Sequence, residues 1–278
     1  MAKLNRLHEI ECTHYSESPS SSSRQALRVW LRSWIAACVL GLCAPALAAN
    51  WEINETSVFT EFNLAPPAAD TEAARRDLEE LLQLQGQRAS VRKDGSSEVR
   101  PSGDCKDANK QRFPGVAGMF GPKSGVDGAQ VLTTSELDLV RPLGGRLISE
   151  IERVAKIVKA KHGRVRPYNA RPDLIKACSV LPEKQIEQNR KVGHSFPSSH
   201  AAIGQALGEV LAEIFPGRAD VIRAQGKRVG FLRKRVGVHF PSDVAAGSAL
   251  GDAIVKNLNR SKAFRQEVDA LTKAARAL

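Results

Sequence analysis

The chain has 278 residues, of which 42% are apolar and only 5% aromatic, and its formal net charge is +11. The apolar share suffices for a sizeable core, while the shortage of aromatic residues and of alternating β-branched runs argues against a sheet protein and favours helices. The positive charge favours anionic partners such as phosphate esters, nucleic acid or a membrane surface, and does not choose among them.

Residues 1–48 have the features of an export signal with a long polar n-region. Arginines precede the apolar run 34–47, and a small-x-small pattern of the kind that signal peptidases accept ends at Ala48. We therefore predict a signal peptide over residues 1–48, a bacterial protein that is periplasmic or secreted, and a mature domain over residues 49–278. An uncleaved anchor is the alternative. Beyond the leader, no apolar run approaches the roughly 20 residues of a membrane span.

The five cysteines divide between the predicted leader and the mature chain. Three of them lie in the leader, and Cys105 and Cys178 remain. A single pair of cysteines in an exported protein predicts a disulfide between them. Two buried thiols are the alternative.

Apolar residues recur with the spacing of helices over most of the mature chain. Residues 50–67 are polar and lack a clear period, and residues 86–128 are rich in Gly, Ser, Lys and Asp, which predicts loops and short turns there. One helix is predicted to begin at Asp70. Further helices are predicted over residues 137–161, 198–215, 220–236, 242–258 and 263–278. Together they predict an all-α fold, a single-domain helical bundle.

Glycines and prolines mark the ends and the close contacts of these helices. Gly163 is predicted to stop the helix that precedes it. Pro197 and Pro241 stand where a first helical turn accepts proline. Gly247 and Gly251 are four residues apart, so both lie on one helix face and predict the close approach of another helix there.

The first of three polar clusters pairs Lys159 with Arg166. The two cations are seven residues apart, almost two helical turns, so both can face one point. Arginine offers a planar fork for two phosphate oxygens, and lysine offers a mobile point charge. The alternative is a solvated basic face, because Lys156, Lys161 and Arg164 lie nearby.

The second cluster is Pro197-Ser198-Ser199-His200 at the start of a predicted helix. Unpaired backbone amides and the positive end of the helix dipole favour an anion at such a place. Ser198 either caps the helix or donates its hydroxyl to phosphate. His194, six residues before His200, is interpreted as incidental.

The third cluster joins Arg233, His239 and Asp243. The spacing of four residues lets Asp243 accept a proton from one ring nitrogen of His239, which leaves the other nitrogen as a nucleophile. The alternatives are a plain pair at a helix start and, for Arg233, a solvated cationic stretch.

Taken together, the three clusters resemble the signature of the type 2 phosphatidic acid phosphatase and vanadium haloperoxidase superfamily. That signature reads Lys, six residues, Arg-Pro; then Pro-Ser-Gly-His; then Ser-Arg, five residues, His, three residues, Asp. Nine residues match it in order and spacing: Lys159, Arg166, Pro167, Pro197, Ser198, His200, Arg233, His239 and Asp243. The chain departs from the signature at Ser199, where the family usually has glycine, and at Leu232, where it usually has serine.

Within the superfamily the chain is most similar to the bacterial class A non-specific acid phosphatases, over about residues 64–275. This resemblance implies an exported, all-helical phosphomonoesterase that works without a metal or other cofactor. Small phosphomonoesters are the expected partners, whereas nucleic acid and stable membrane insertion after leader cleavage are not expected. Assembly into a homo-oligomer is left open.

The resemblance also implies the role of each site residue. His239 attacks phosphorus and forms a phosphohistidine, Asp243 steadies its ring, and His200 protonates the leaving alcohol. The phosphate is held by Lys159, Arg166, Ser198, Ser199 and Arg233. A protonated His200 beside a deprotonated His239 predicts a bell-shaped pH profile on the acidic side.

Three other functions fit parts of the sequence. A vanadate-dependent haloperoxidase would use the same anion pocket, with vanadate bound to His239. A lipid phosphatase would need an uncleaved leader as its tether. A basic nucleic-acid-binding protein would account for the charge but not for the ordered histidines, and the chain lacks basic stretches interleaved with aromatic residues.

Overall fold

The computed structural model of the protein describes residues 51–87, 90–91, 97–98, 115–125, 129–177 and 194–278. Backbone contacts divide the chain into two units, Met1–Ala48 and Ala49–Leu278, and every described residue belongs to the second unit. The predicted signal peptide and the cysteine pair Cys105 and Cys178 lie outside the described residues.

Helices make up most of the described chain, and the predicted all-α fold is confirmed. The helices are α2 (Glu55–Glu61), α3 (Glu72–Gly86), α5 (Val116–Phe120), α6 (Thr134–His162), α7 (Pro167–Ala170), α9 (Ser199–Ile214), the 3-10 helix η2 (Pro216–Arg218), α10 (Ala219–Arg235), α11 (Pro241–Leu258) and α12 (Lys262–Ala275). Two short strands, β1 (Ser90–Val91) and β2 (Ser97–Glu98), pair antiparallel, with Ser90 opposite Glu98. In the described part of the chain, no helix combines the length and the apolar character needed to cross a bilayer.

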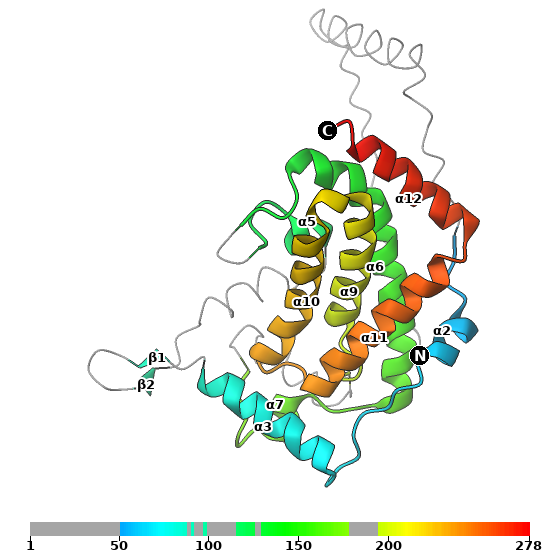
Figure 1. The fold of residues 1–278 in the computed structure, drawn as a ribbon. Helices are drawn as coiled ribbons and strands as arrows, with labels where there is room; N and C mark the ends of the chain where they lie inside the picture. The colour runs from blue at the N-terminus through cyan, green and yellow to red at the C-terminus, as the bar shows by residue number, and fades with distance from the viewer. Residues whose placement is uncertain (1–50, 88–89, 92–96, 99–114, 126–128, 178–193) are drawn as a thin grey trace, which may run out of the picture. The chain divides into compact units, whose positions relative to one another are not determined.

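The helix α9 lies at the centre of the bundle. It packs against α6, α10, α11 and α12, and Figure 1 shows it running between α10 and α11. Eleven of its sixteen residues are buried, and all of these are alanine, glycine or aliphatic residues. Its N-cap residue Ser198 is also buried, and the Ser198 amide donates to the carbonyl oxygen of Asp243 in the first turn of α11.

The glycines of α11 permit this close packing, as the sequence predicts. A Cβ atom at Gly247 would lie 2.3 Å from the carbonyl oxygen of Ser198, and one at Gly251 would lie 2.6 Å from that of Ala202. Only glycine therefore fits at this spacing, because the atoms in the way belong to the backbone. The contact holds the first half of α11 directly against the start of α9.

The ends of the long helices place the chain for the site. The side chain of Thr133 accepts a hydrogen bond from the backbone of Glu136, whose own side chain accepts one from Thr133, so α6 begins with a capping box. The helix ends at Gly163, whose φ of 58° is left-handed, and the predicted stop is confirmed. Pro241 occupies the first turn of α11 as predicted, whereas Pro197 precedes the N-cap residue of α9 and lies outside that helix.

Among the described residues, α2, α5 and α7 are short helices that lie where the sequence predicts none. α2 forms because the side chain of Asn54 accepts a hydrogen bond from the Ser57 amide, and Val58 is buried. α5 buries Val116 and Phe120 within the main core, although residues 86–128 are predicted as loops. Helices of this length complete no repeating apolar period, so their stability comes from caps and from tertiary packing.

Candidate active site

Lys159 lies in the last turn of α6, where its side chain is buried. Its ammonium group donates to the carbonyl oxygen of His194 at 2.9 Å and to that of Pro197. Burial and, to a lesser extent, the charge of Arg166 lower the pKa of Lys159 to about 7, although Asp243 opposes both effects. Lys159 therefore changes its charge near neutral pH.

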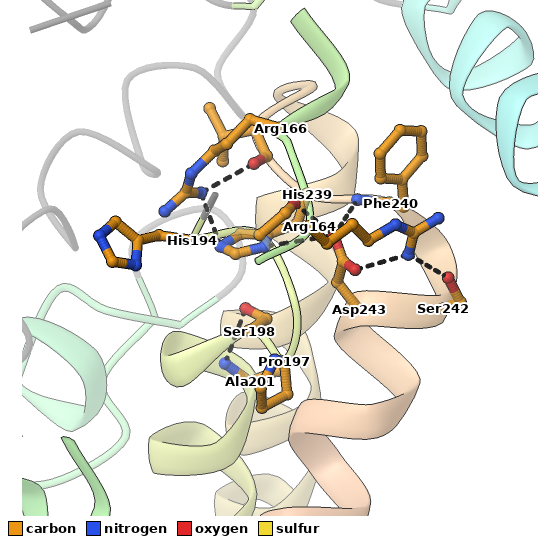
Figure 2. A network of polar contacts seen from close by, with 12 residues as sticks. Arg164, Arg166, His194, Pro197, Ser198, Ala201, His239, Phe240, Ser242 and Asp243 are labelled. Atoms are coloured by element: carbon orange, nitrogen blue, oxygen red, sulfur yellow. Dashed lines mark hydrogen bonds and ion pairs between the residues drawn. The ribbon is translucent and has the colours of Figure 1, made fainter. Parts of the chain in front are cut away.

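Arg166 is the N-cap residue of the four-residue helix α7. Its Nη1 atom donates to the carbonyl oxygen of Val238 at 2.8 Å and lies 2.8 Å from Nε2 of His239 (Figure 2). A guanidinium group can only donate, so Nε2 accepts this hydrogen bond and the ring proton is on Nδ1. Lys159 and Arg166 thus face one point, as predicted, but from a helix end and the following turn.

His239 is almost completely buried before α11, with only 3% of its surface exposed. Burial holds its pKa well below 6.5, and the charges of four neighbours, Arg166, Lys159, Arg233 and His200 in descending order, lower it further. The low pKa favours the neutral imidazole, whose lone pair is on Nε2.

Asp243 is a fully buried carboxylate in the first turn of α11. Its Oδ2 atom accepts from the Ser195 hydroxyl at 2.6 Å and from the Phe240 amide at 2.9 Å, and its Oδ1 atom accepts from Arg164 at 2.6 Å. Nδ1 of His239 lies 3.6 Å from Oδ2, which is longer than a hydrogen bond. The carboxylate of Asp243 therefore makes no hydrogen bond to the imidazole of His239 in this structure and acts on it only through its charge.

Ser198 is the N-cap residue of α9. Its hydroxyl oxygen accepts from the amide of Ala201 at 3.4 Å, and its own amide donates to the carbonyl oxygen of Asp243 at 2.9 Å. Ser199 and His200 follow in the first helical turn, and both are partly exposed. The helix start thus lies directly beside α11 and presents its first amides and the His200 imidazole at the site.

Arg233 and Leu232 are neighbours in the last turn of α10 with different surroundings. Burial lowers the pKa of Arg233 to about 10, and the charge of Arg166 contributes to the shift, so the two cations face the same place. The Leu232 side chain is fully buried among apolar neighbours that include Tyr168 and Phe240. The position where the family usually has serine is therefore part of the hydrophobic core in this chain.

Four polar residues near the site were missed or undervalued by the sequence reasoning. Ser195 bonds Asp243 directly, and His194 lies beside Arg166 in Figure 2, where burial and then the charges of Lys159 and Arg166 lower its pKa. The other two are Arg164, which the sequence places on a basic face, and Asp77, which carries no motif. Neither Ser195 nor Asp77 has a sequence signal of its own.

Three cations act through their charges on the buried imidazole of His239, and the start of α9 lies beside the first turn of α11. Such an arrangement binds a compact oxyanion and presents a nitrogen lone pair to it. Among the residues that the structure describes, no cluster of three or more His, Cys, Asp or Glu side chains could hold a metal ion.

Residues 154–265 match the family model described as PAP2 superfamily. The matched segment contains every motif residue from Lys159 to Asp243. The resemblance seen in the three motifs is thereby confirmed for this part of the chain.

The chain is also similar to proteins that are named acid phosphatases. The chain is 28% identical to a non-specific acid phosphatase of Providencia stuartii over 155 residues, which are 55% of this chain and 58% of the relative. It is 33% identical to an acid phosphatase of Zymomonas mobilis over 94 residues, 34% of this chain and 35% of the relative. A non-specific acid phosphatase of Salmonella typhimurium is 28% identical over 214 residues, 77% of this chain and 79% of the relative. The match thus spans less than two thirds of the length of the first two relatives.

Proposed function

We propose that this protein is an exported acid phosphatase that hydrolyses small phosphomonoesters through a phosphohistidine on His239. The superfamily match and the relatives named acid phosphatase support the phosphatase class. The observation that carries the mechanism is the neutral imidazole of His239, whose Nε2 lone pair lies 2.8 Å from Arg166. An electrophile held by the surrounding cations would lie against that lone pair.

Substrate binding replaces one contact that the structure shows, the one between Arg166 and His239. The phosphate dianion is held by Lys159, Arg166 and Arg233 and by the amides at the start of α9. Nη1 of Arg166 moves from Nε2 of His239 to a phosphate oxygen, because a dianion is a stronger acceptor than a neutral imidazole. This exchange frees the lone pair at the moment when phosphorus is in place.

In the first chemical step, Nε2 of His239 attacks phosphorus and the bond from phosphorus to the ester oxygen breaks. Protonated His200 gives its proton to the departing oxygen, so the leaving group is a neutral alcohol. The phosphorylated ring carries a positive charge with its proton on Nδ1. The carboxylate of Asp243, 3.6 Å from Nδ1, stabilises that charge.

In the second step, neutral His200 takes a proton from water and the water oxygen attacks phosphorus. The bond between phosphorus and nitrogen breaks, phosphate leaves, and His239 is neutral again. His200 must be protonated for the first step while His239 must be neutral, so activity follows a bell-shaped pH profile. The low pKa of His239 places the acidic limb of that profile well below pH 6.5.

The decisive experiment is hydrolysis of a chromogenic phosphomonoester by the wild type and by His239→Ala, with a chelator present throughout. We expect a loss of at least about 10³-fold in kcat for the variant, typical of removing a nucleophile, and no effect of the chelator. Arg171→Gln is the control, because Arg171 is exposed and pairs only with Asp173 in the described structure.

A second measurement tests the intermediate itself. Brief reaction of His200→Ala with a phosphorus-labelled nitrophenyl ester, whose phenolate leaves without a proton, should leave label on the protein in an acid-labile, base-stable bond, because hydrolysis of the intermediate still lacks its base. Activity that persists in His239→Ala, activity that the chelator abolishes, or label that persists in the double variant His200→Ala with His239→Ala would each contradict the mechanism.

A further inference from the structure

Arg164 connects the site to a helix that carries none of the signature residues. Its Nη1 atom donates to Oδ1 of Asp243 at 2.6 Å and to the Ser242 hydroxyl at 2.7 Å, and its Nη2 atom donates to Oδ2 of Asp77 at 2.8 Å. Figure 2 shows the guanidinium reaching Asp243 and Ser242. One planar fork thus joins two carboxylates, one on α3 and one on α11.

The surroundings of this fork hold it in one orientation. The Cζ atom of Arg164 lies 4.0 Å from the centroid of the Phe240 ring, a cation-π contact on one face. Asp77, only 5% exposed, also accepts from the amide and the hydroxyl of Ser242. Asp77 therefore fixes the first turn of α11 and the guanidinium at the same time.

The two carboxylate oxygens of Asp243 face different groups. Oδ1 faces Arg164, whereas Oδ2 faces Nδ1 of His239 at 3.6 Å. A cation on one oxygen of a carboxylate reduces the field that the whole group exerts on its other neighbours. Asp77 in turn partly neutralises Arg164, so the balance among three charges decides how negative Asp243 is towards the imidazole.

We propose that Arg164, supported by Asp77, is a positioning residue that orients Asp243 towards His239 and limits how strongly that carboxylate attracts a proton onto the ring. The proposal rests on the proposed function for the role of His239 as the nucleophile. The excess proton matters because it would occupy the lone pair that attacks phosphorus. Arg164 thereby keeps the lone pair of His239 available to attack phosphorus, while Oδ2 of Asp243 still faces Nδ1 of the ring.

The test measures the pKa of His239 directly, by a 15N NMR titration of purified protein labelled at histidine. The signal is assigned by its absence in His239→Ala. The charged groups that face this ring from the packed elements are Lys159, Arg166, His200, Arg233 and Asp243. All of them stay unchanged in the variants below, so a shift reports the charge balance at Asp243.

Arg164→Gln should raise the pKa of His239 by about one pH unit or more, because an unmatched carboxylate favours the imidazolium. Arg164→Lys keeps the positive charge and should return the value towards that of the wild type. Asp77→Asn leaves Arg164 with one carboxylate, so the pKa of His239 should fall or stay the same. The exposed Arg171→Gln is the control and should change nothing.

In kinetic assays the acidic limb of kcat/KM should move upwards in Arg164→Gln by the same amount as the pKa. A folded Arg164→Gln protein with an unchanged pKa of His239 would overturn the proposal, as would a rise in Asp77→Asn. If Arg164→Gln does not fold, the Asp77→Asn and Arg164→Lys titrations still decide it, since a rise in either of about one unit contradicts the charge balance. An inactive wild type would refute the proposed function, while the titration would still test the role of Arg164.

Discussion

The two cations nearest to the lone pair of His239 differ in their capacity to change charge. Arg166 keeps its charge at any ordinary pH, although burial lowers its pKa, because a guanidinium group starts from so high a value. Lys159 is buried as well, and its pKa is about 7. Of the two charges that we propose bind phosphate, one is therefore permanent and the other depends on pH.

Binding of an anion should consequently be linked to protonation of Lys159. Above about pH 7 Lys159 is mostly neutral before an anion binds, so binding of a dianion takes up a proton from solution and its affinity falls as pH rises. Sulfate is the suitable probe, because it keeps its two charges across this range. We expect its competitive inhibition constant to rise by up to about tenfold per pH unit between pH 7 and 9.

The matched variant for this measurement is Lys159→Arg, which keeps a positive charge over the whole range. Its inhibition constant for sulfate should depend less steeply on pH than that of the wild type. The same slope in both proteins would show that another group takes up the proton. The sign follows from linkage. The contribution of Lys159 to binding is complete below its pKa in the free protein, and it is lost as pH rises towards its higher pKa in the complex.

At the scale of elements, the contact between α9 and α11 brings the second and third clusters together. Ser198 and His200 start one helix, while His239 and Asp243 come directly before and in the first turn of the other. The absent side chain of Gly247 lets the two backbones meet there. The geometry of the proposed active site and the packing of the two helices thus depend on the same few atoms.

Gly247→Ala should weaken both. Its Cβ atom would lie 2.3 Å from the carbonyl oxygen of Ser198, so α11 must move away from α9. We expect a loss of about 1–3 kcal/mol in the free energy of unfolding, measured with urea, and a fall in kcat. Gly145→Ala on α6 is the control, because nothing lies within 4 Å of its Cβ position.

The control should gain about 0.5–1 kcal/mol, since alanine is the better helix former. Equal stability of the two variants would contradict the packing account.

The long helices were predictable from the sequence and the short ones were not. A repeating apolar period predicts α6 and α9, and the glycines on one face of α11 predict the close approach of another helix. The short helix α2, in contrast, depends on the cap that Asn54 provides.

At the scale of the whole molecule, the sequence predicts which residues gather at the site better than it predicts how they are connected. Spacing identifies Arg166, His239 and Asp243 because each motif is local. Asp77 lies 87 residues before Arg164, and no local pattern links them. The distance between His239 and Asp243 was also beyond sequence reasoning, because Asp243 takes three other donors that only the fold brings to it.

Packing at the start of the described chain limits where a leader could be removed without loss of contacts. Trp51 is buried, its indole nitrogen donates to Glu267 at 2.9 Å, and its ring meets Phe264 edge to face with centroids 5.3 Å apart. These contacts tie the beginning of the described chain to α12. A cut beyond Trp51 would remove them, whereas a cut after Ala48 would leave them all in place.

We therefore expect the exported protein to begin at Ala49 and to be recovered in the soluble fraction, which intact mass and N-terminal sequencing will check. Ala48→Arg should block processing, because signal peptidases require a small residue there. Ala49→Ser is the control and should be processed normally. An N-terminus beyond Trp51, or a wild-type chain that stays uncleaved in the membrane, would contradict the prediction, and the second result would favour a tethered phosphatase.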